Sequence, residues 1–236
     1  LLFDLNHIPV TYAPYLSLLK SVLGYVDTEH FTYSELFNEI NANTGGIICG
    51  LNIFSPKEED GNLQVKFGIK CKMLYPKMAF TFDMIDEIIN TSKLEDEKRL
   101  YEIIAQQKSR AQMELVSAGH STAMLRASSY FSKSAAYQDA IGGIEYYRLI
   151  ADLEVHFEKK KAELIQTLKT LKELIFQPDN FMVSYTATEE GYKYLEETLV
   201  SFKGKLKASH VVLEGPLEMN PVKKNEAIKT AGQEQY

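Results

Sequence analysis

Two segments, residues 47–53 and 63–73, alternate between apolar and polar side chains, and this alternation restricts the possible folds more than any other feature. The large apolar residues and both cysteines occupy odd positions: Ile47, Cys49, Leu51, Ile53, Leu63, Val65, Phe67, Ile69, Cys71 and Met73. A period of two is typical of β-strands with one packed face and one face in water. Because both segments share the odd parity, we predict one antiparallel hairpin, with its turn in residues 56–62.

The two cysteines, Cys49 and Cys71, fall on the predicted packed face of this hairpin. Two cysteines are too few for a disulfide framework, which favours a reducing compartment, and we predict a cytoplasmic location. A catalytic pairing of Cys49 with a histidine would need a supporting motif, and the sequence contains none. We therefore interpret both cysteines as small core side chains.

A helix with clear start and stop signals precedes the hairpin. Thr32, followed three residues later by Glu35, matches a capping box, in which both side chains hydrogen-bond backbone N–H groups. Four large side chains then recur at helical spacing, which predicts one buried face: Tyr33, Leu36, Phe37 and Ile40. Residues 43–46 are expected to end the helix, because their two glycines tolerate left-handed backbone angles.

Helical periodicity dominates the rest of the chain. Helices are predicted within residues 14–26, 76–118, 144–175 and 189–202. Gly119-His120 interrupts this pattern, a segment of small residues continues to Ser134, and Gly142-Gly143 forms a second break. Short strands are predicted at residues 1–5 and 181–186. Because the strands alternate, we predict an α+β fold, a mostly antiparallel sheet with helices packed on one face.

The end of the chain has a different composition. Pro216, Pro221 and the pair Lys223-Lys224 are typical of a connector between domains. We predict that residues 1–214 form one domain, and that residues 215–236 are a connector and the truncated beginning of a following domain. Removal of this tail would then leave the stability of the domain almost unchanged.

The charge balance argues against nucleic acid as a partner. Lys and Arg total 26 against 32 Asp and Glu, which gives a net charge of −6 without any long basic stretch. The densest basic run, Lys159-Lys160-Lys161, is interpreted as a solvated helix face. No apolar run approaches the ~18 residues of a membrane helix, so no membrane partner is expected.

Three motifs carry a resemblance to a known family: L-G-Y-V-D-T-E-H-F-T-Y-S-E-L at residues 23–36, N-T-G-G-I at 43–47, and G-H-S-T-A-M-L-R-A-S-S-Y-F-S at 119–132. The chain resembles the presequence-protease branch of the pitrilysin/insulinase zinc metallopeptidases over nearly its whole length. Within that branch it is similar to the non-catalytic domain that follows the mid-chain linker, after the catalytic half. The resemblance implies an α/β roll and a zinc ion in the parent enzyme.

The metal motif of that family, His-x-x-Glu-His, is absent from this chain. The motif works because two histidines four residues apart lie on one helical face and can bind one ion. The residues found four positions after His7, His30, His120, His156 and His210 are Thr11, Ser34, Met124, Lys160 and Glu214. We therefore predict no catalytic residue, no metal ligand and no cofactor in this chain. Glu29-His30 is interpreted as an exposed turn pair before the helix cap.

Two functional hypotheses follow. In the first, the chain is a non-catalytic part of a zinc metalloendopeptidase that degrades unstructured peptides. It would help to close a substrate chamber, with the catalytic half of the same polypeptide and the peptide as its partners. His120 and Arg126 are candidate wall residues of that chamber, although His120 could instead be a helix-break side chain hydrogen-bonded to the backbone. In the second, the chain is an assembly or interaction module from a non-peptidase relative.

Overall fold

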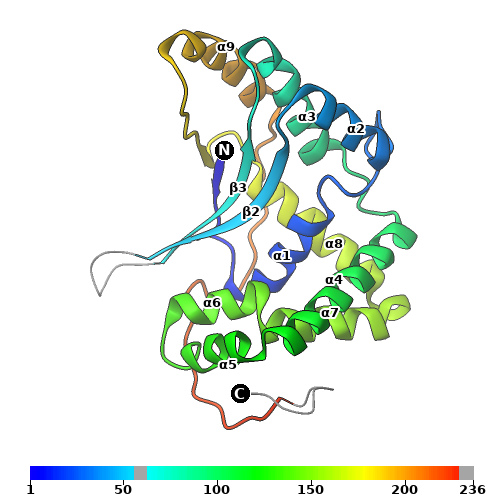
Figure 1. Cartoon of the computed structure of the whole chain (residues 1–236), viewed down its shortest axis with the longest axis vertical. Helices are drawn as coiled ribbons and strands as arrows, with labels where there is room; N and C mark the ends of the chain where they lie inside the picture. Colours follow the sequence, from blue (N-terminus) through cyan, green and yellow to red (C-terminus); the bar gives the residue numbers. More distant parts are fainter. Residues whose placement is uncertain (56–62, 229–236) are drawn as a thin grey trace.

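Four strands form one antiparallel sheet in the order β2-β3-β1-β4 (Figure 1). The strands are β1 (Leu2–Asp4), β2 (Ile47–Phe54), β3 (Gln64–Cys71) and β4 (Phe181–Met182). The computed structural model describes residues 1–55 and 63–228. Cys49 pairs with Ile69 and Leu51 with Phe67, so the hairpin with its odd residues on one face is confirmed. The predicted turn at residues 56–62 lies outside the described residues.

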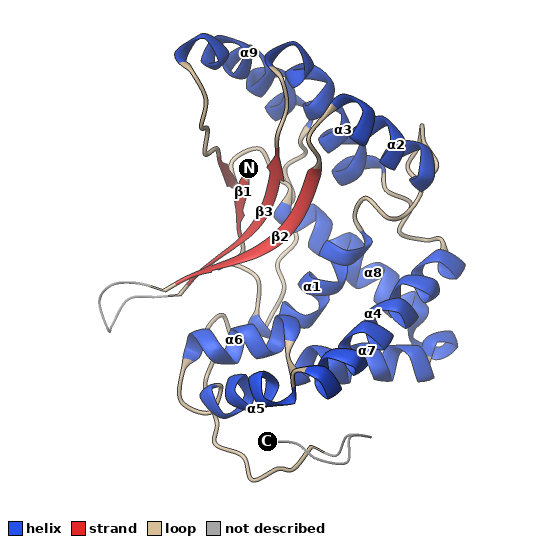
Figure 2. Ribbon diagram, in the orientation of Figure 1, coloured by secondary structure: helices blue, strands red, loops and turns tan. Residues whose placement is uncertain are grey.

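Helices make up most of the remaining described chain (Figure 2). They are α1 (Ala13–Val22), α2 (Tyr33–Asn43), α3 (Met78–Thr91), α4 (Glu97–Ser117), α5 (Gly119–Ser128), α6 (Lys133–Gly142), α7 (Ile144–Val155), α8 (Phe157–Ile175) and α9 (Glu189–Lys205). Short 3-10 turns, η1 (Val10–Tyr12) and η2 (Tyr75–Lys77), precede α1 and α3. Pro14 lies in the first turn of α1, where its missing N–H has no intrahelical partner to lose.

The core lies between the odd face of the sheet and the helices. Phe3 and Phe67 are completely buried, and the ring of Phe176, just after α8, meets both edge-on at centroid distances of 4.9 and 5.3 Å. Burial of each such side chain stabilises the fold by about 1.5–3 kcal/mol. On the opposite face, Gln64 and Lys70 of β3 are exposed. The predicted α+β fold with a mostly antiparallel sheet is confirmed.

The helices form two groups around the ends of the sheet (Figure 1). Helix α3 packs against α2 and α9 in one group, while α4, α5, α6 and α7 pack against one another in the other. Helix α1 contacts β2 as well as α6 and α8, so it joins the sheet to the second group. Across the described ranges, 1–55 and 63–228, none of these helices has both the length and the apolar character needed to cross a membrane.

The predicted buried face of α2 is only half correct. Leu36 and Ile40 are buried, but Tyr33 and Phe37 are 42% and 60% exposed. The main neighbour of α2 is α3, and one helix covers only a narrow stripe of another. The guanidinium of Arg99 lies 4.0 Å from the centroid of the Tyr33 ring, which gives this exposed ring a cation–π partner.

Three segments differ from the sequence-based expectation. The small-residue segment before Ser134 forms α5 and the start of α6, which Ser132 caps by accepting a hydrogen bond from Ala135 N at 3.3 Å. The long helix expected at residues 144–175 is divided at His156, whose φ of −111° and ψ of 24° leave the helical region. The strand expected at residues 181–186 is limited to β4, because its partner β1 has only three residues.

Candidate functional site

The histidines lie on separate elements and each has its own surroundings. His7 Nε2 lies 3.2 Å from the Leu174 carbonyl, and His30 Nδ1 lies 3.0 Å from Glu87 Oε2. Glu29-His30 is therefore more than an exposed turn pair, because α3 supplies a carboxylate partner. Within residues 1–55 and 63–228, no three His, Cys, Asp or Glu side chains are arranged to hold a metal ion. Zinc thus fits no described cluster, and its absence from the whole chain stays a prediction.

Both cysteines pack against the hydrophobic core. Burial raises the pKa of the Cys49 thiol to about 12, so this thiol stays protonated at neutral pH. A protonated thiol is a poor nucleophile and a poor metal ligand. The interpretation of Cys49 and Cys71 as small core side chains agrees with this environment.

The most elaborate polar site surrounds Arg126 on α5, a residue that is only 4% exposed. Its Nη1 donates to Asp139 Oδ2 at 2.5 Å, its Nη2 lies 2.8 Å from Glu145 Oε1, and its Nε donates to Glu226. These carboxylates come from α6, from α7 and from the segment after α9. Asp139 also accepts a hydrogen bond from Ile144 N at 2.9 Å, so the same carboxylate caps α7. We call these four charged side chains the Arg126 cluster.

Further charges complete the surroundings of the Arg126 cluster. Arg148 Nη2 donates to Glu226 Oε2 at 3.0 Å, and Lys224 Nζ donates to Glu145 Oε1 at 3.3 Å. The three cations therefore face three carboxylates, which limits the free-energy cost of burying the guanidinium. Hydrogen bonds, first of all from Arg126, hold the pKa of the Glu226 carboxyl well below its usual range. An ionised, fully engaged carboxylate suits a structural role rather than proton transfer.

The structure does not bring the two predicted wall residues together. His120 lies in the first turn of α5 and is exposed, whereas Arg126 points inward toward α6 and α7. Six residues are between one and two helical turns, so these side chains occupy different sides of α5. Their role as chamber wall stays a prediction. Sequence reasoning missed Asp139 and Glu226, which are 13 and 100 residues from Arg126 and carry no local signal.

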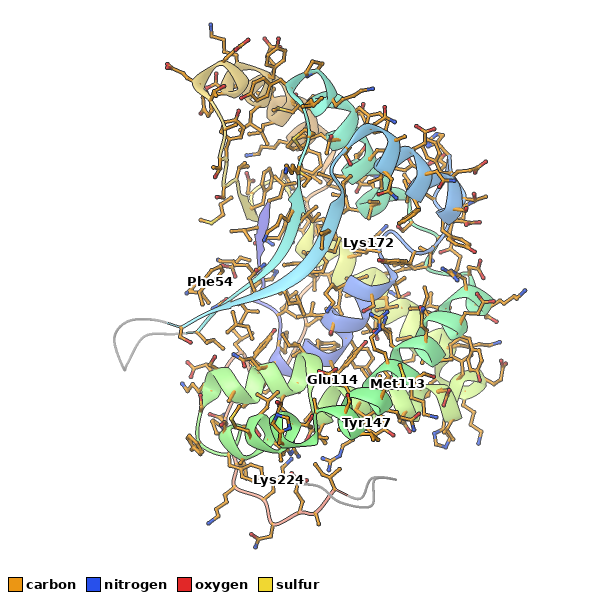
Figure 3. The ribbon with its side chains drawn as sticks, in the orientation of Figure 1. Phe54, Met113, Glu114, Tyr147, Lys172 and Lys224 are labelled. Carbon is orange, nitrogen blue, oxygen red and sulfur yellow. The ribbon has the colours of Figure 1, made fainter. Side chains whose placement is uncertain are left out.

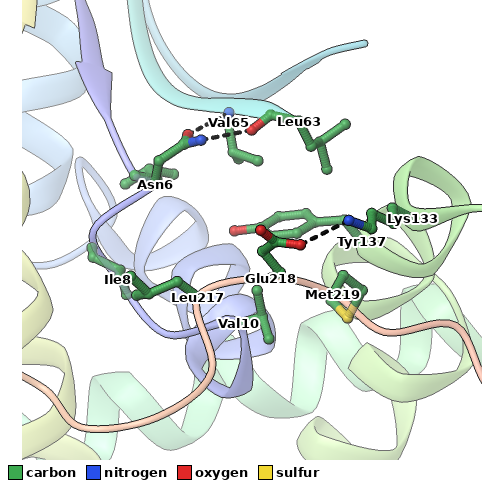
Figure 4. Close-up of a pocket in the computed structure, with 11 residues that line it drawn as sticks. Asn6, Ile8, Val10, Leu63, Val65, Lys133, Tyr137, Leu217, Glu218 and Met219 are labelled. Atoms are coloured by element: carbon green, nitrogen blue, oxygen red, sulfur yellow. Dashed lines mark hydrogen bonds and ion pairs between the residues drawn. The ribbon is translucent and has the colours of Figure 1, made fainter. Parts of the chain in front are cut away.

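A cavity of about 220 Å³ lies near the Arg126 cluster, between the sheet, α6 and the segment after α9 (Figure 4). Its walls are mainly apolar and include Leu5, Ile8, Val10, Leu63, Val65 and Met219. Tyr137 of α6 points into it, and the ion pair between Lys133 and Glu218, 2.7 Å long, lies on its solvent side. Sequence periodicity gave no sign of this cavity, because three separate parts of the chain build it.

A family model for the domain associated with metallopeptidases of family 16, subfamily C, matches residues 1–153, which include α1 to α6, most of α7 and three of the four strands. The chain belongs to this peptidase-associated family. The resemblance to the presequence-protease branch of the zinc metallopeptidases is therefore confirmed. Tyr137 and all but one member of the Arg126 cluster lie in the matched range.

Several curated proteins resemble this peptidase-associated chain. Protein HypA of Clostridium perfringens is 32% identical over 234 residues, which cover 99% of this chain and 24% of HypA. The mitochondrial presequence protease of Yarrowia lipolytica is 27% identical over 157 residues, 66% of this chain and 16% of that protein. The mitochondrial presequence protease of Danio rerio is 21% identical over 193 residues, 79% of this chain and 18% of that protein. The chain thus spans a quarter or less of these relatives.

The segment that follows α9 in this peptidase-associated chain runs beneath α5 and α6 (Figure 3, where Lys224 marks it). Pro216 O accepts a hydrogen bond from Val10 N at 2.8 Å, and Glu218 and Glu226 reach α6 and α5. The predicted division between residues 1–214 and 215–236 stays a prediction. Whatever follows it in the chain, the part up to Glu226 is tied to the domain by ion pairs.

Proposed function

We propose that this chain is a non-catalytic part of a zinc metalloendopeptidase that degrades unstructured peptides. It forms part of the half that closes the substrate chamber over the catalytic half. Membership of the peptidase-associated family carries the proposal, and the matches to presequence proteases support it. The sequence lacks His-x-x-Glu-His, so the ligands for zinc would lie elsewhere in the parent polypeptide.

The length of the relatives supports a partner within the same polypeptide. This chain covers 24% of HypA and 18% or less of the two presequence proteases compared above, so most of each relative lies outside the matched part. Large apolar side chains are exposed along α4, α5 and the turn after α5, and we call them the α4–α5 apolar residues: Met113 (Figure 3), Val116, Met124 and Phe131. Exposed apolar groups of this size favour contact with another protein surface. We propose that the catalytic half covers them.

The chemical role of such a domain is positioning. A closed chamber excludes water and holds a flexible peptide against the metal, and this can contribute several kcal/mol to lowering the barrier. His120, exposed at the start of α5, is the proposed wall residue that could touch a peptide. Arg126 would act indirectly, because its guanidinium is buried in the Arg126 cluster.

The test is to express the two halves of the parent protein separately and to measure cleavage of an unstructured peptide. The catalytic half, checked for bound zinc, should lose most of its turnover alone. Addition of the half that contains this chain should restore turnover by at least about tenfold, a change of ~1.4 kcal/mol in the barrier. Full activity of the catalytic half alone would contradict the proposal.

Matched substitutions locate the contact between the halves. Phe131→Ser should weaken the restoration, because Phe131 is 78% exposed among the α4–α5 apolar residues. Val200→Ser on α9 is the control, since Val200 is also 78% exposed but belongs to the other helix group. Equal effects of both substitutions would argue against this interface.

The alternative proposal is an assembly or interaction module from a non-peptidase relative. The two are separated by the parent sequence, because a His-x-x-Glu-His in the part that precedes this chain decides for the peptidase. A parent with that motif destroyed would favour the assembly role. The predicted cytoplasmic location stays a proposal, and several relatives are named as mitochondrial proteins.

A further inference from the structure

The cavity beside α6 contains one polar group that lacks a partner. Tyr137 is only 4% exposed, and its hydroxyl makes no hydrogen bond to any residue within 1–55 or 63–228. Burial alone raises the pKa of Tyr137, so the phenol is protonated and available as a donor. Figure 4 shows its ring extending from α6 into the space below Leu63 and Val65. A buried hydroxyl without a partner is unfavourable unless something fills the cavity and accepts its proton.

The other polar groups at the cavity are already engaged. Asn6 donates to Leu63 O at 2.6 Å and accepts from Val65 N at 2.9 Å. Lys133 and Glu218 neutralise each other on the solvent side, where their side chains are 51% and 58% exposed. A site of this kind offers no counter-charge to an ionised ligand, whose burial would therefore be costly.

Water alone is a poor occupant of this cavity. An ordered buried water typically needs two to four polar partners, and the apolar walls leave mainly the Tyr137 hydroxyl. An apolar cavity of about 150 Å³ can hold a benzene ring, so the 220 Å³ found here can hold a branched or aromatic side chain. The fitting ligand is a neutral, mainly apolar group with one hydrogen-bond acceptor.

We propose that this cavity binds an apolar side chain of an extended peptide, with Tyr137 Oη donating to a carbonyl oxygen of the same residue. The choice of a peptide rests on the proposed function, since a peptide is the substrate class of the proposed parent enzyme. The segment after α9 helps to form the site, because Glu218 and Met219 contribute to its walls. The cavity is therefore complete only when this segment is in place.

The experiment titrates the 236-residue chain with N-acetyl-leucinamide and follows backbone amide shifts by NMR. We expect saturable shifts at cavity residues such as Val10 and Val65, with Kd on the order of 1 mM for so small a probe. N-acetyl-glycinamide, which lacks the side chain, should give no saturable shift. The same probe with a free carboxylate, N-acetyl-leucine, should bind at least several-fold more weakly.

Two matched substitutions make the test specific. Tyr137→Phe keeps the ring and removes the donor, and should weaken binding by about fivefold, the effect of one hydrogen bond. Tyr146→Phe on α7 is the control, since the Tyr146 hydroxyl also lacks a partner within the described residues but lies outside the cavity. Val10→Phe should fill part of the cavity and abolish binding, and its thermal melting curve shows whether it folds.

The outcomes separate this inference from the proposed function. If N-acetyl-leucinamide gives no saturable shift, or if Tyr137→Phe and Tyr146→Phe bind it equally well, the proposed site is wrong. Neither result affects the complementation of the two halves. If complementation fails while the probe binds as expected, the cavity is a peptide-binding site but the chamber-closing function is wrong.

Discussion

At the scale of single residues, Arg126 has surroundings that its neighbours in sequence do not provide. Its carboxylate partners come from α6, α7 and the segment after α9. A buried charge of this kind contributes little net stability when all its partners are present, but removal of one partner leaves an uncompensated charge. The Arg126 cluster therefore makes the packing of these three parts sensitive to single substitutions.

Asp139→Asn is expected to lower the free energy of unfolding by about 3 kcal/mol, because Asp139 is 1% exposed and also caps α7. Urea denaturation followed by circular dichroism measures this difference. Glu145→Gln is the matched control, since the Glu145 side chain is 37% exposed and water can replace its contact, so a loss below about 1 kcal/mol is expected. Equal losses would show that burial does not determine the effect.

The pair His30–Glu87 predicts a pH-dependent contribution to stability. The hydrogen bond to Glu87 raises the pKa of His30 above its usual value, near 6.5 in an unfolded chain. Burial tends to raise the pKa of Glu87, but the hydrogen bonds that it accepts lower it to about 2, so Glu87 is ionised throughout the neutral range. The stabilisation is therefore complete below about pH 6.5 and is lost as pH rises through the folded pKa of His30.

We expect His30→Ala to lower the melting temperature more at pH 5.5 than at pH 8.5. Thermal melts of the variant and the unsubstituted chain at both pH values provide the measurement. His120→Ala serves as the control, because its exposed side chain makes no hydrogen bond to another described residue. A His30→Ala effect that is the same at both pH values would contradict the ion pair.

At the scale of elements, α2 shows how local sequence signals and packing divide their influence. The capping box forms as predicted, with Glu35 N donating to Thr32 Oγ1 at 3.3 Å and Thr32 N donating to Glu35 Oε2 at 2.9 Å. The position of the helix start is therefore local information. Which large side chains become buried depends instead on α3, and that decides for Leu36 and against Phe37.

Thr32→Ala is expected to destabilise the chain by about 1 kcal/mol, the usual effect of losing an N-cap. Thr32→Ser keeps the hydroxyl and should recover most of that loss. Urea denaturation of both variants gives the comparison, and hydrogen exchange of the first turn of α2 shows whether the loss is local. A stable Thr32→Ala chain with an unprotected first turn would mean that α2 can fray without unfolding the core.

At the scale of the whole molecule, the segment after α9 links parts that are distant in sequence. It contacts η1 through Pro216, α6 through Glu218 and α5 through Glu226. The sequence suggested a connector whose loss would hardly matter. These contacts lead us to expect the opposite, because Arg126 would lose one of its charged partners.

Removal of residues 215–236 should therefore lower the free energy of unfolding by about 1–3 kcal/mol, the range for a buried polar group left without a partner. Lys224→Ala is the control, since its contact with Glu145 is exposed, and it should have a much smaller effect. Chemical denaturation of the shortened chain provides the measurement. An unchanged unfolding transition would support the original connector interpretation.

The sequence by itself determined the features that depend on near neighbours. The parity of Cys49 and Leu51 fixed the packed face of the hairpin, and Thr32 and Gly119-His120 marked a helix start and a helix break. Three short motifs were enough to indicate the family. Alternation and capping act over a few residues, so they can be read without knowing the fold.

Only the tertiary structure decided which side chains meet across the molecule. Periodicity tells which side of its own helix a residue occupies, but it does not tell which other element covers that side. Arg126 finds Glu226 100 residues away, and the cavity at Tyr137 joins the sheet, α6 and the segment after α9. Both depend on the docking of whole elements, because the free energy of a buried charge or cavity is set by everything around it.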